Sequence, residues 1–89
     1  MIRYHLDFSK QANDDIDFYK KSGNKIILKK LLLLLQELTE HPFTGTGKPE
    51  ALKHDLAGKW SRRINQEHRL VYQVLENSVL INSAKGHYQ

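Results

Sequence analysis

The spacing of apolar residues predicts a short strand followed by two helices. Apolar and polar residues alternate over 2–7, which is typical of a strand. Asp7 or Ser9 can cap the helix that follows, and apolar residues then recur at i, i+4 and i+7 from Ala12. The stretch 22–24 (SGN) breaks this helical pattern.

A second, longer helix is expected from about Asn24 to Glu40, where leucine and isoleucine recur at helical spacing. Pro42 ends it, because the residue before a proline avoids the helical region. Leu32 and Leu33 lie partly off the apolar stripe, so this helix is apolar over more than half of its girth. It either packs between the sheet and the first helix or meets another protein chain, and the choice between monomer and homodimer stays open.

Glycine and proline then mark a loop over 43–58, with a short helical turn expected near Ala51–His54. Alternation returns after this loop. It predicts three strands, at about 60–65, 69–74 and 79–84. The resulting order is β-α-α-β-β-β. It indicates a single α+β domain over 1–89, with two N-terminal helices packed on a mainly antiparallel sheet.

The composition narrows the class of protein. A chain of 89 residues without cysteine has no disulfide framework, thiolate zinc site or cysteine nucleophile. No signal peptide is expected, and the Leu31–Leu35 run is far shorter than the roughly 20 residues that span a bilayer. We therefore expect a cytoplasmic protein without membrane contact. Of the net charge of +4, residues 41–89 carry +3 together with four of the five histidines, which suits a polyanion such as nucleic acid.

The same basic half contains the groups that metal-free cleavage of RNA requires. The ribose 2′-hydroxyl needs a base, the departing 5′-oxygen needs an acid, and the phosphoryl oxygens need cations. Glu50 can be the base, His87 the acid, and Arg63 and Arg69 the cations whose forked donors match phosphate. Tyr88 can stack on an unpaired base. Such a site would produce a 2′,3′-cyclic phosphate and a 5′-hydroxyl, and it would leave DNA intact.

Each candidate also has a structural interpretation. Lys53 lies three residues after Glu50, so one turn of helix would bring both to one face, but the two can also form a simple ion pair on a solvated loop. Arg62 and Arg63 can form the polar face of a strand. His68 can make a structural hydrogen bond. The set is therefore more informative than any single member.

Several motifs are distributed along the second half of the chain: Pro42-Phe43, Gly47–His54 (GKPEALKH), Trp60–Ile64 (WSRRI), Glu67–Tyr72 (EHRLVY) and His87-Tyr88. Together they resemble the Txe/YoeB family, which comprises bacterial toxins of type II toxin–antitoxin systems within the RelE/ParE superfamily. The resemblance implies a microbial RNase fold. It also implies an mRNA interferase that cuts mRNA at the ribosomal A site.

The resemblance further implies a role for each matched residue. These are the base Glu50, the phosphate stabiliser Arg69, the acid His87, the stacking Tyr88, and the phosphate supports Lys53 and Arg63. We also expect Arg62 and Lys85 to contact RNA, although Lys85 stands where relatives often carry arginine. Gln89 extends past the usual terminal tyrosine, and its effect is open.

The implied partners are mRNA, the ribosome with its rRNA, and an antitoxin of the YefM/Phd type whose acidic, disordered tail folds over the toxin. No cofactor or metal is implied, and DNA is contacted only indirectly through the toxin–antitoxin complex. Two alternatives stay open. One is a ParE-like gyrase inhibitor, which needs no acid–base pair; the other is a non-catalytic module that binds RNA or the ribosome.

Overall fold

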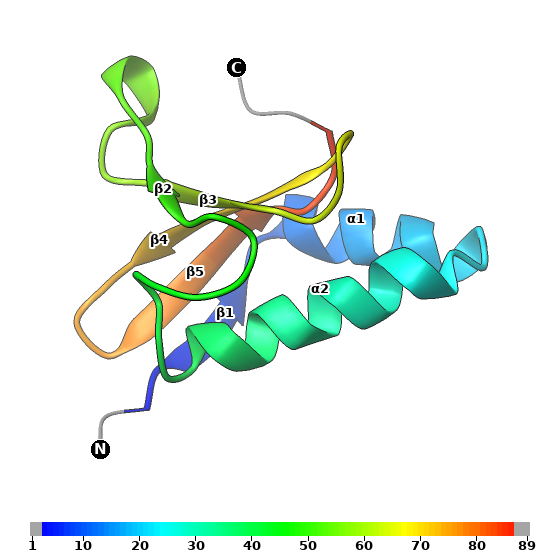
Figure 1. The fold of residues 1–89 in the computed structure, drawn as a ribbon, viewed down its shortest axis with the longest axis horizontal. Coiled ribbons are helices and arrows are strands. Elements are labelled where there is room, and N and C mark those ends of the chain that lie inside the picture. Colours follow the sequence, from blue (N-terminus) through cyan, green and yellow to red (C-terminus); the bar gives the residue numbers. More distant parts are fainter. Residues whose placement is uncertain (1–2, 87–89) are drawn as a thin grey trace.

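The computed structural model of the protein describes residues 3–86 (Figure 1). Its helices and strands are β1 (His5–Phe8), α1 (Lys10–Lys21), α2 (Lys25–Leu38), β2 (Glu50–Ala51), the 3₁₀ turn η1 (His54–Leu56), β3 (Trp60–Arg63), β4 (Arg69–Val74) and β5 (Ser78–Ser83). The α+β class and the two N-terminal helices are thereby confirmed.

The strands form one sheet in the order β1-β5-β4-β3-β2. β1 runs parallel to β5, and the other neighbouring pairs are antiparallel. The sheet has one strand more than the sequence predicts, because Glu50–Ala51 pairs with Trp60–Ser61. The predicted helical turn at Ala51–His54 is wrong in its bounds, since β2 occupies its first residue and η1 begins only at His54.

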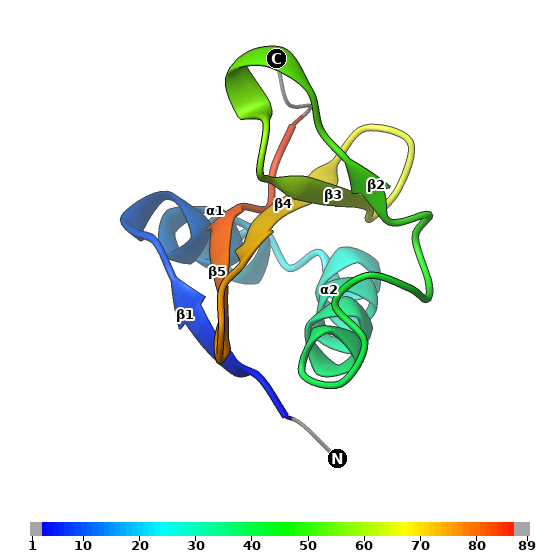
Figure 2. The same cartoon turned by 90° about the vertical axis from the view of Figure 1, so that its left-hand side faces the viewer.

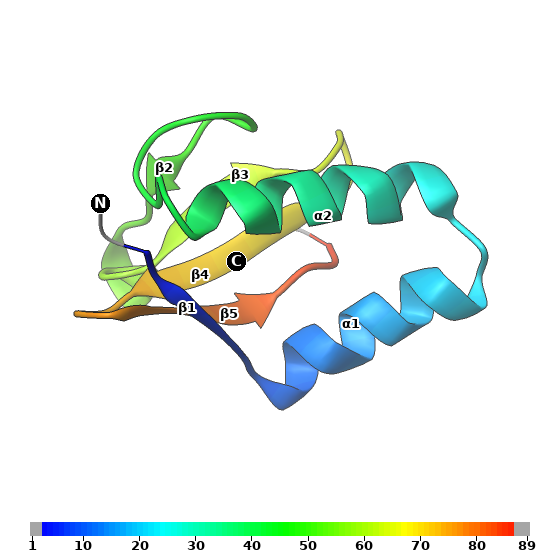
Figure 3. The ribbon, with the colours of Figure 1, turned by 90° about the horizontal axis from the view of Figure 1, so that it is seen from below.

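Both helices pack against the sheet and contact each other (Figure 3). The helix α2 begins after Asn24, whose side chain accepts a hydrogen bond from the amide of Ile27 at 3.1 Å. Leu31, Leu34 and Leu38 recur on one side of α2 and are buried in the core with residues of β4 and β5. No helix within residues 3–86 is long and apolar enough to cross a membrane.

Two irregular segments lie at the β2–β3 side of the sheet. The chain between α2 and β2 crosses from the helix layer to the sheet edge, and the stretch that carries η1 projects beyond β2 and β3 (Figure 2). Leu32 and Leu33 of α2 have 63% and 44% of their surface exposed, so the rest of the chain does not cover these two leucines.

Candidate active site

A cleft with a volume of about 290 Å³ lies where β2, β3 and β4 meet. It is lined by Gly47, Lys48, Pro49, Glu50, Ser61, Arg63 and Arg69. The cleft thus combines one predicted base, Glu50, with the two predicted phosphate-binding arginines. Both arginines lie well beyond Glu50 in the sequence, and the three residues converge only because their strands are neighbours in the sheet.

Strand pleating explains why these side chains share one face. Glu50 is the register partner of Ser61, and Arg63 is the register partner of Arg69. Residues two apart in a strand point to the same face, and directly paired residues do so too. Ser61 and Arg63 are two residues apart in β3, so their partners Glu50 on β2 and Arg69 on β4 lie on the same face of the sheet, on either side of β3.

The pairing of Arg63 with Arg69 is unfavourable for the sheet itself, because like charges directly opposite each other repel. An anion between them would remove that cost. The Arg69 guanidinium is held in place by donating through Nη1 to the backbone oxygens of Asn65 at 2.9 Å and His68 at 3.3 Å. Arg63 and Arg69 therefore form a cationic pair on the cleft wall, and the backbone anchors the Arg69 guanidinium there.

Lys53 and Glu50 line a second concavity of about 410 Å³, formed by residues 50–56. The helical reason for expecting them together is wrong, because Glu50 lies in β2 and Lys53 has an extended backbone with φ −124°. They line one hollow because the chain turns through η1 directly after Lys53. Since Glu50 lines both hollows, Lys53 lies next to the cleft that holds the arginines.

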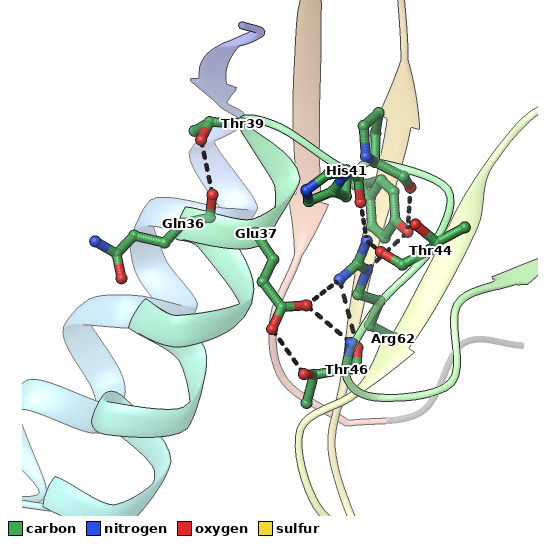
Figure 4. A network of polar contacts seen from close by, with 9 residues as sticks. Gln36, Glu37, Thr39, His41, Thr44, Thr46 and Arg62 are labelled. Atoms are coloured by element: carbon green, nitrogen blue, oxygen red, sulfur yellow. Dashed lines mark hydrogen bonds and ion pairs between the residues drawn. The ribbon is translucent and has the colours of Figure 1, made fainter. Parts of the chain in front are cut away.

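The structure does not bring Arg62 to the cleft. Adjacent strand residues point to opposite faces, and the Arg62 side chain is fully buried on the helix side of β3 (Figure 4). Its five N–H groups donate to Tyr72 Oη at 3.1 Å, Glu37 Oε1 at 3.0 Å, and the backbone oxygens of Thr46 at 3.4 Å, Thr44 at 2.8 Å and His41. Arg62 therefore organises the loop that precedes Glu50.

Glu37 completes this network from the last turn of α2 (Figure 4). It accepts hydrogen bonds from the Thr46 amide at 2.8 Å and the Thr46 hydroxyl at 2.6 Å. Burial alone would raise the pKa of the Glu37 carboxyl, but the hydrogen bonds from Thr46 and the charge of Arg62 outweigh it, so the pKa lies below its usual value. The carboxylate is thus ionised and paired at neutral pH.

The remaining predicted residues belong to the end of the chain. The ammonium of Lys85 lies 4.0 Å from the ring centroid of Phe18 on α1, and Lys85 does not line the described cleft. His87 and Tyr88 lie outside the described residues. The last described residue is Gly86, whose backbone oxygen accepts a hydrogen bond from the Arg69 amide at 2.9 Å.

Comparison with known proteins decides the family. A profile of the YoeB-like toxin of bacterial type II toxin–antitoxin systems matches residues 8–88. Toxin YoeB of Escherichia coli (strain K12) is 45% identical over 83 residues, which is 93% of this chain and 98% of that protein. The chain belongs to the YoeB-like toxin family.

Solved structures of YoeB toxins have the same fold. The YoeB dimer from Staphylococcus aureus superposes with a TM-score of 0.86 at 44% identity, covering 97% of this chain and 99% of that one. The YoeB–YefM complex from the same organism gives a TM-score of 0.85 at 45% identity with the same coverage. The expected fold class is confirmed, and the chain is a toxin of a type II system.

Two lining residues with polar side chains, Ser61 and Lys48, were not predicted as site residues. Ser61 lies on the cleft face with only 3% exposure, and the alternation that assigns Arg63 to that face also includes Ser61. Lys48 lines the cleft with a left-handed backbone, φ 53°, which an isolated lysine between glycine and proline does not reveal. The alternation of side chains along the strand could have identified Ser61. The position of Lys48 depends on how the loop folds against the sheet.

Proposed function

We propose that this YoeB-like toxin is a ribosome-dependent mRNA interferase that cuts mRNA by metal-independent acid–base chemistry. The observation that carries the proposal is the convergence of Glu50, Arg63 and Arg69 on one cleft. The carboxylate can take a proton from the attacking hydroxyl, and the two guanidiniums can stabilise the negative charge that then grows on the phosphoryl oxygens.

The reaction begins when Glu50 removes the proton from the ribose 2′-hydroxyl. The resulting oxygen attacks the adjacent phosphorus, and the bond to the 5′-oxygen breaks. Arg63 and Arg69 stabilise the added charge on the phosphoryl oxygens, with Lys53 nearby. His87 gives its proton to the departing 5′-oxygen. The products are a 2′,3′-cyclic phosphate and a 5′-hydroxyl. The RNA loses the 2′-hydroxyl proton to Glu50 and gains one proton from His87 at the 5′-oxygen.

The ribosome would provide the substrate geometry that the cleft itself lacks. The cleft is small, and its fixed groups are mainly cationic, so it offers affinity for RNA backbone with little choice of sequence. A codon held in the A site, with Tyr88 stacked on a base, would be presented in a conformation suited to in-line attack. Toxicity then follows from arrested translation in the cytoplasm.

The proposed protein partners are an antitoxin of the YefM/Phd type and a second copy of the toxin. Both kinds of assembly occur among the solved relatives, as the YoeB–YefM complex and the YoeB dimer of Staphylococcus aureus. The exposed Ile26, Leu32 and Leu33 of α2 support an apolar contact with either partner. DNA contact is proposed only through the antitoxin.

The test is to express the toxin from a tight promoter and to map mRNA 5′ ends. Wild type is compared with Glu50→Gln, His87→Gln and the control Glu76→Gln, which changes an exposed carboxylate in the turn between β4 and β5. Loss of the acid His87 is expected to lower the cleavage rate by about 10²–10⁴-fold. Cleavage of naked RNA by the purified toxin, measured without ribosomes, should continue unchanged in excess EDTA.

New 5′ ends within codons that are present in wild type and Glu76→Gln but absent in the other two variants support the nuclease. Equal growth arrest in all variants without new RNA ends would refute it in favour of a binding module. Double-strand breaks in DNA would instead identify a gyrase inhibitor.

A further inference from the structure

The end of β5 is held by side chains from α1 after its strand pairing stops. β5 ends at Ser83, and the next residue, Ala84, is fully buried. The Ala84 amide donates to Asp15 Oδ2 at 2.8 Å, and the Tyr19 hydroxyl donates to the Ala84 backbone oxygen at 2.7 Å. Both backbone groups of Ala84 are thus satisfied by two residues of one helix.

Gly86 is held in the same way from the turn before β4, which lies beside the end of β5 in Figure 1. Its amide donates to His68 Nδ1 at 2.8 Å, and its backbone oxygen accepts from the Arg69 amide at 2.9 Å. Gly86 has φ 76°, a left-handed conformation that suits glycine. Four hydrogen bonds therefore fix the chain at two positions outside the regular strand.

The side chains that hold these positions are themselves supported. Asp15 is 3% exposed, and its second oxygen accepts from Gln11 Nε2 at 2.7 Å. The Tyr19 ring contacts the His68 ring edge to face, with centroids 5.5 Å apart. Burial, followed by the nearby charges of Asp15 and Glu67, raises the pKa of Tyr19 to about 12, so its hydroxyl remains a donor at neutral pH.

We propose that His68, with Asp15 and Tyr19, is a positioning residue that fixes the chain directly before His87. The proposal rests on the proposed function, in which His87 is the acid. One peptide bond separates Gly86 from His87. A misplacement of a catalytic group by about 1 Å can cost on the order of 10²-fold in rate. His68 acts here through an unprotonated Nδ1, because its partner is an N–H donor.

The position of the acceptor nitrogen provides a matched pair of variants. In His68→Asn the amide oxygen takes the place of Nδ1, whereas in His68→Gln it takes the place of Nε2 and does not reach the Gly86 amide. The His68 backbone also accepts from the Ile64 amide and donates to Asn65 Oδ1, and neither bond involves the His68 side chain. His5→Gln, at an exposed position of β1, is the control.

Three measurements are made on the purified toxin: hydrogen exchange of the Gly86 amide, thermal unfolding, and kcat and KM for mRNA on ribosomes. We expect His68→Gln to lower kcat by about 10²-fold with unchanged KM and to accelerate Gly86 exchange. His68→Asn should restore slow exchange and most of kcat, and His5→Gln should match wild type. Tyr19→Phe, which loses only the hydroxyl, should lower kcat about two- to tenfold. This variant tests the same positioning role if His68→Gln does not fold.

Equal kcat in His68→Gln, His68→Asn and wild type would overturn the positioning role, provided that Glu50→Gln is inactive in the same assay. An equal loss of kcat in both His68 variants would also overturn the positioning role, because a hydrogen-bond acceptor at the Nδ1 position would then make no difference. Wild-type toxin that leaves mRNA uncut marks the failure of the nuclease proposal itself. These outcomes separate the two proposals.

Discussion

Replacing Arg62 with lysine tests whether the buried guanidinium organises the loop before Glu50. Arginine offers five N–H donors in a planar fork, and each has an acceptor in the structure. Lysine keeps the charge but offers three donors on a single nitrogen. At least two of the five acceptors therefore lose their partner, and they lie around a side chain with 0% exposure.

The magnitude follows from those lost bonds. A hydrogen bond lost from this network costs about 1–3 kcal/mol, so two cost about 2–6 kcal/mol. That is a large fraction of the roughly 5–15 kcal/mol that stabilises a domain. Because about 1 kcal/mol shifts the melting temperature of a domain of this size by about 4–8 °C, Arg62→Lys should melt at least about 8 °C below wild type.

Arg63→Lys is the matched control, since it makes the same chemical change at the next residue on the opposite face of β3. Arg63 is exposed, so its replacement should alter the free energy of unfolding by no more than about 0.5 kcal/mol. It should nevertheless reduce RNA cleavage, because it removes a forked donor from the cleft. Thermal melting and urea unfolding, both followed by Trp60 fluorescence, measure the two variants. Equal stability of the two would refute the assignment of Arg62 to the loop.

Two further predictions concern the same loop. Because the pKa of Glu37 is lowered in the folded protein, its carboxylate stabilises the fold fully above the unfolded pKa of about 4.3. This stabilisation is lost as pH falls through the lower folded pKa. In Glu37→Gln the urea midpoint should therefore decline less steeply below about pH 5 than in wild type. Gly47→Ala should lower both stability and cleavage, because its Cβ would lie 2.8 Å from the Arg63 backbone oxygen at φ +85°. Gly58→Ala, at φ +92° with open space around it, should cost only the backbone strain of about 1–3 kcal/mol and spare cleavage.

The elements that the sequence predicts well are those with many periods. The apolar residues of α2 repeat over three turns, and Pro42 limits where the helix can end, so its bounds were close to those observed. The strand β2 has only two residues, too few for any period to appear. Its existence depends on pairing with β3, which is a tertiary contact that local sequence does not encode.

The two adjacent arginines show a different limit. Alternation in β3 requires Arg62 and Arg63 to face opposite sides, yet charge alone made both candidates for phosphate. Which of them is buried depends on whether the core provides a partner, and that partner, Glu37, lies 25 residues earlier in the chain. A charged residue on the same strand face as Trp60 was the available signal, because a buried arginine is tolerated only when it is paired.

The proposed catalytic groups depend on support from residues that do not line the cleft. The loop before Glu50 is held through Arg62, and the chain before His87 is held through His68 and residues of α1. In both cases the contacts are side-chain hydrogen bonds to backbone groups of irregular segments. Substitutions at these anchors should therefore lower kcat without weakening RNA binding, since the cationic pair of Arg63 and Arg69 stays in the sheet. A lower kcat with unchanged RNA binding is what distinguishes positioning from contact.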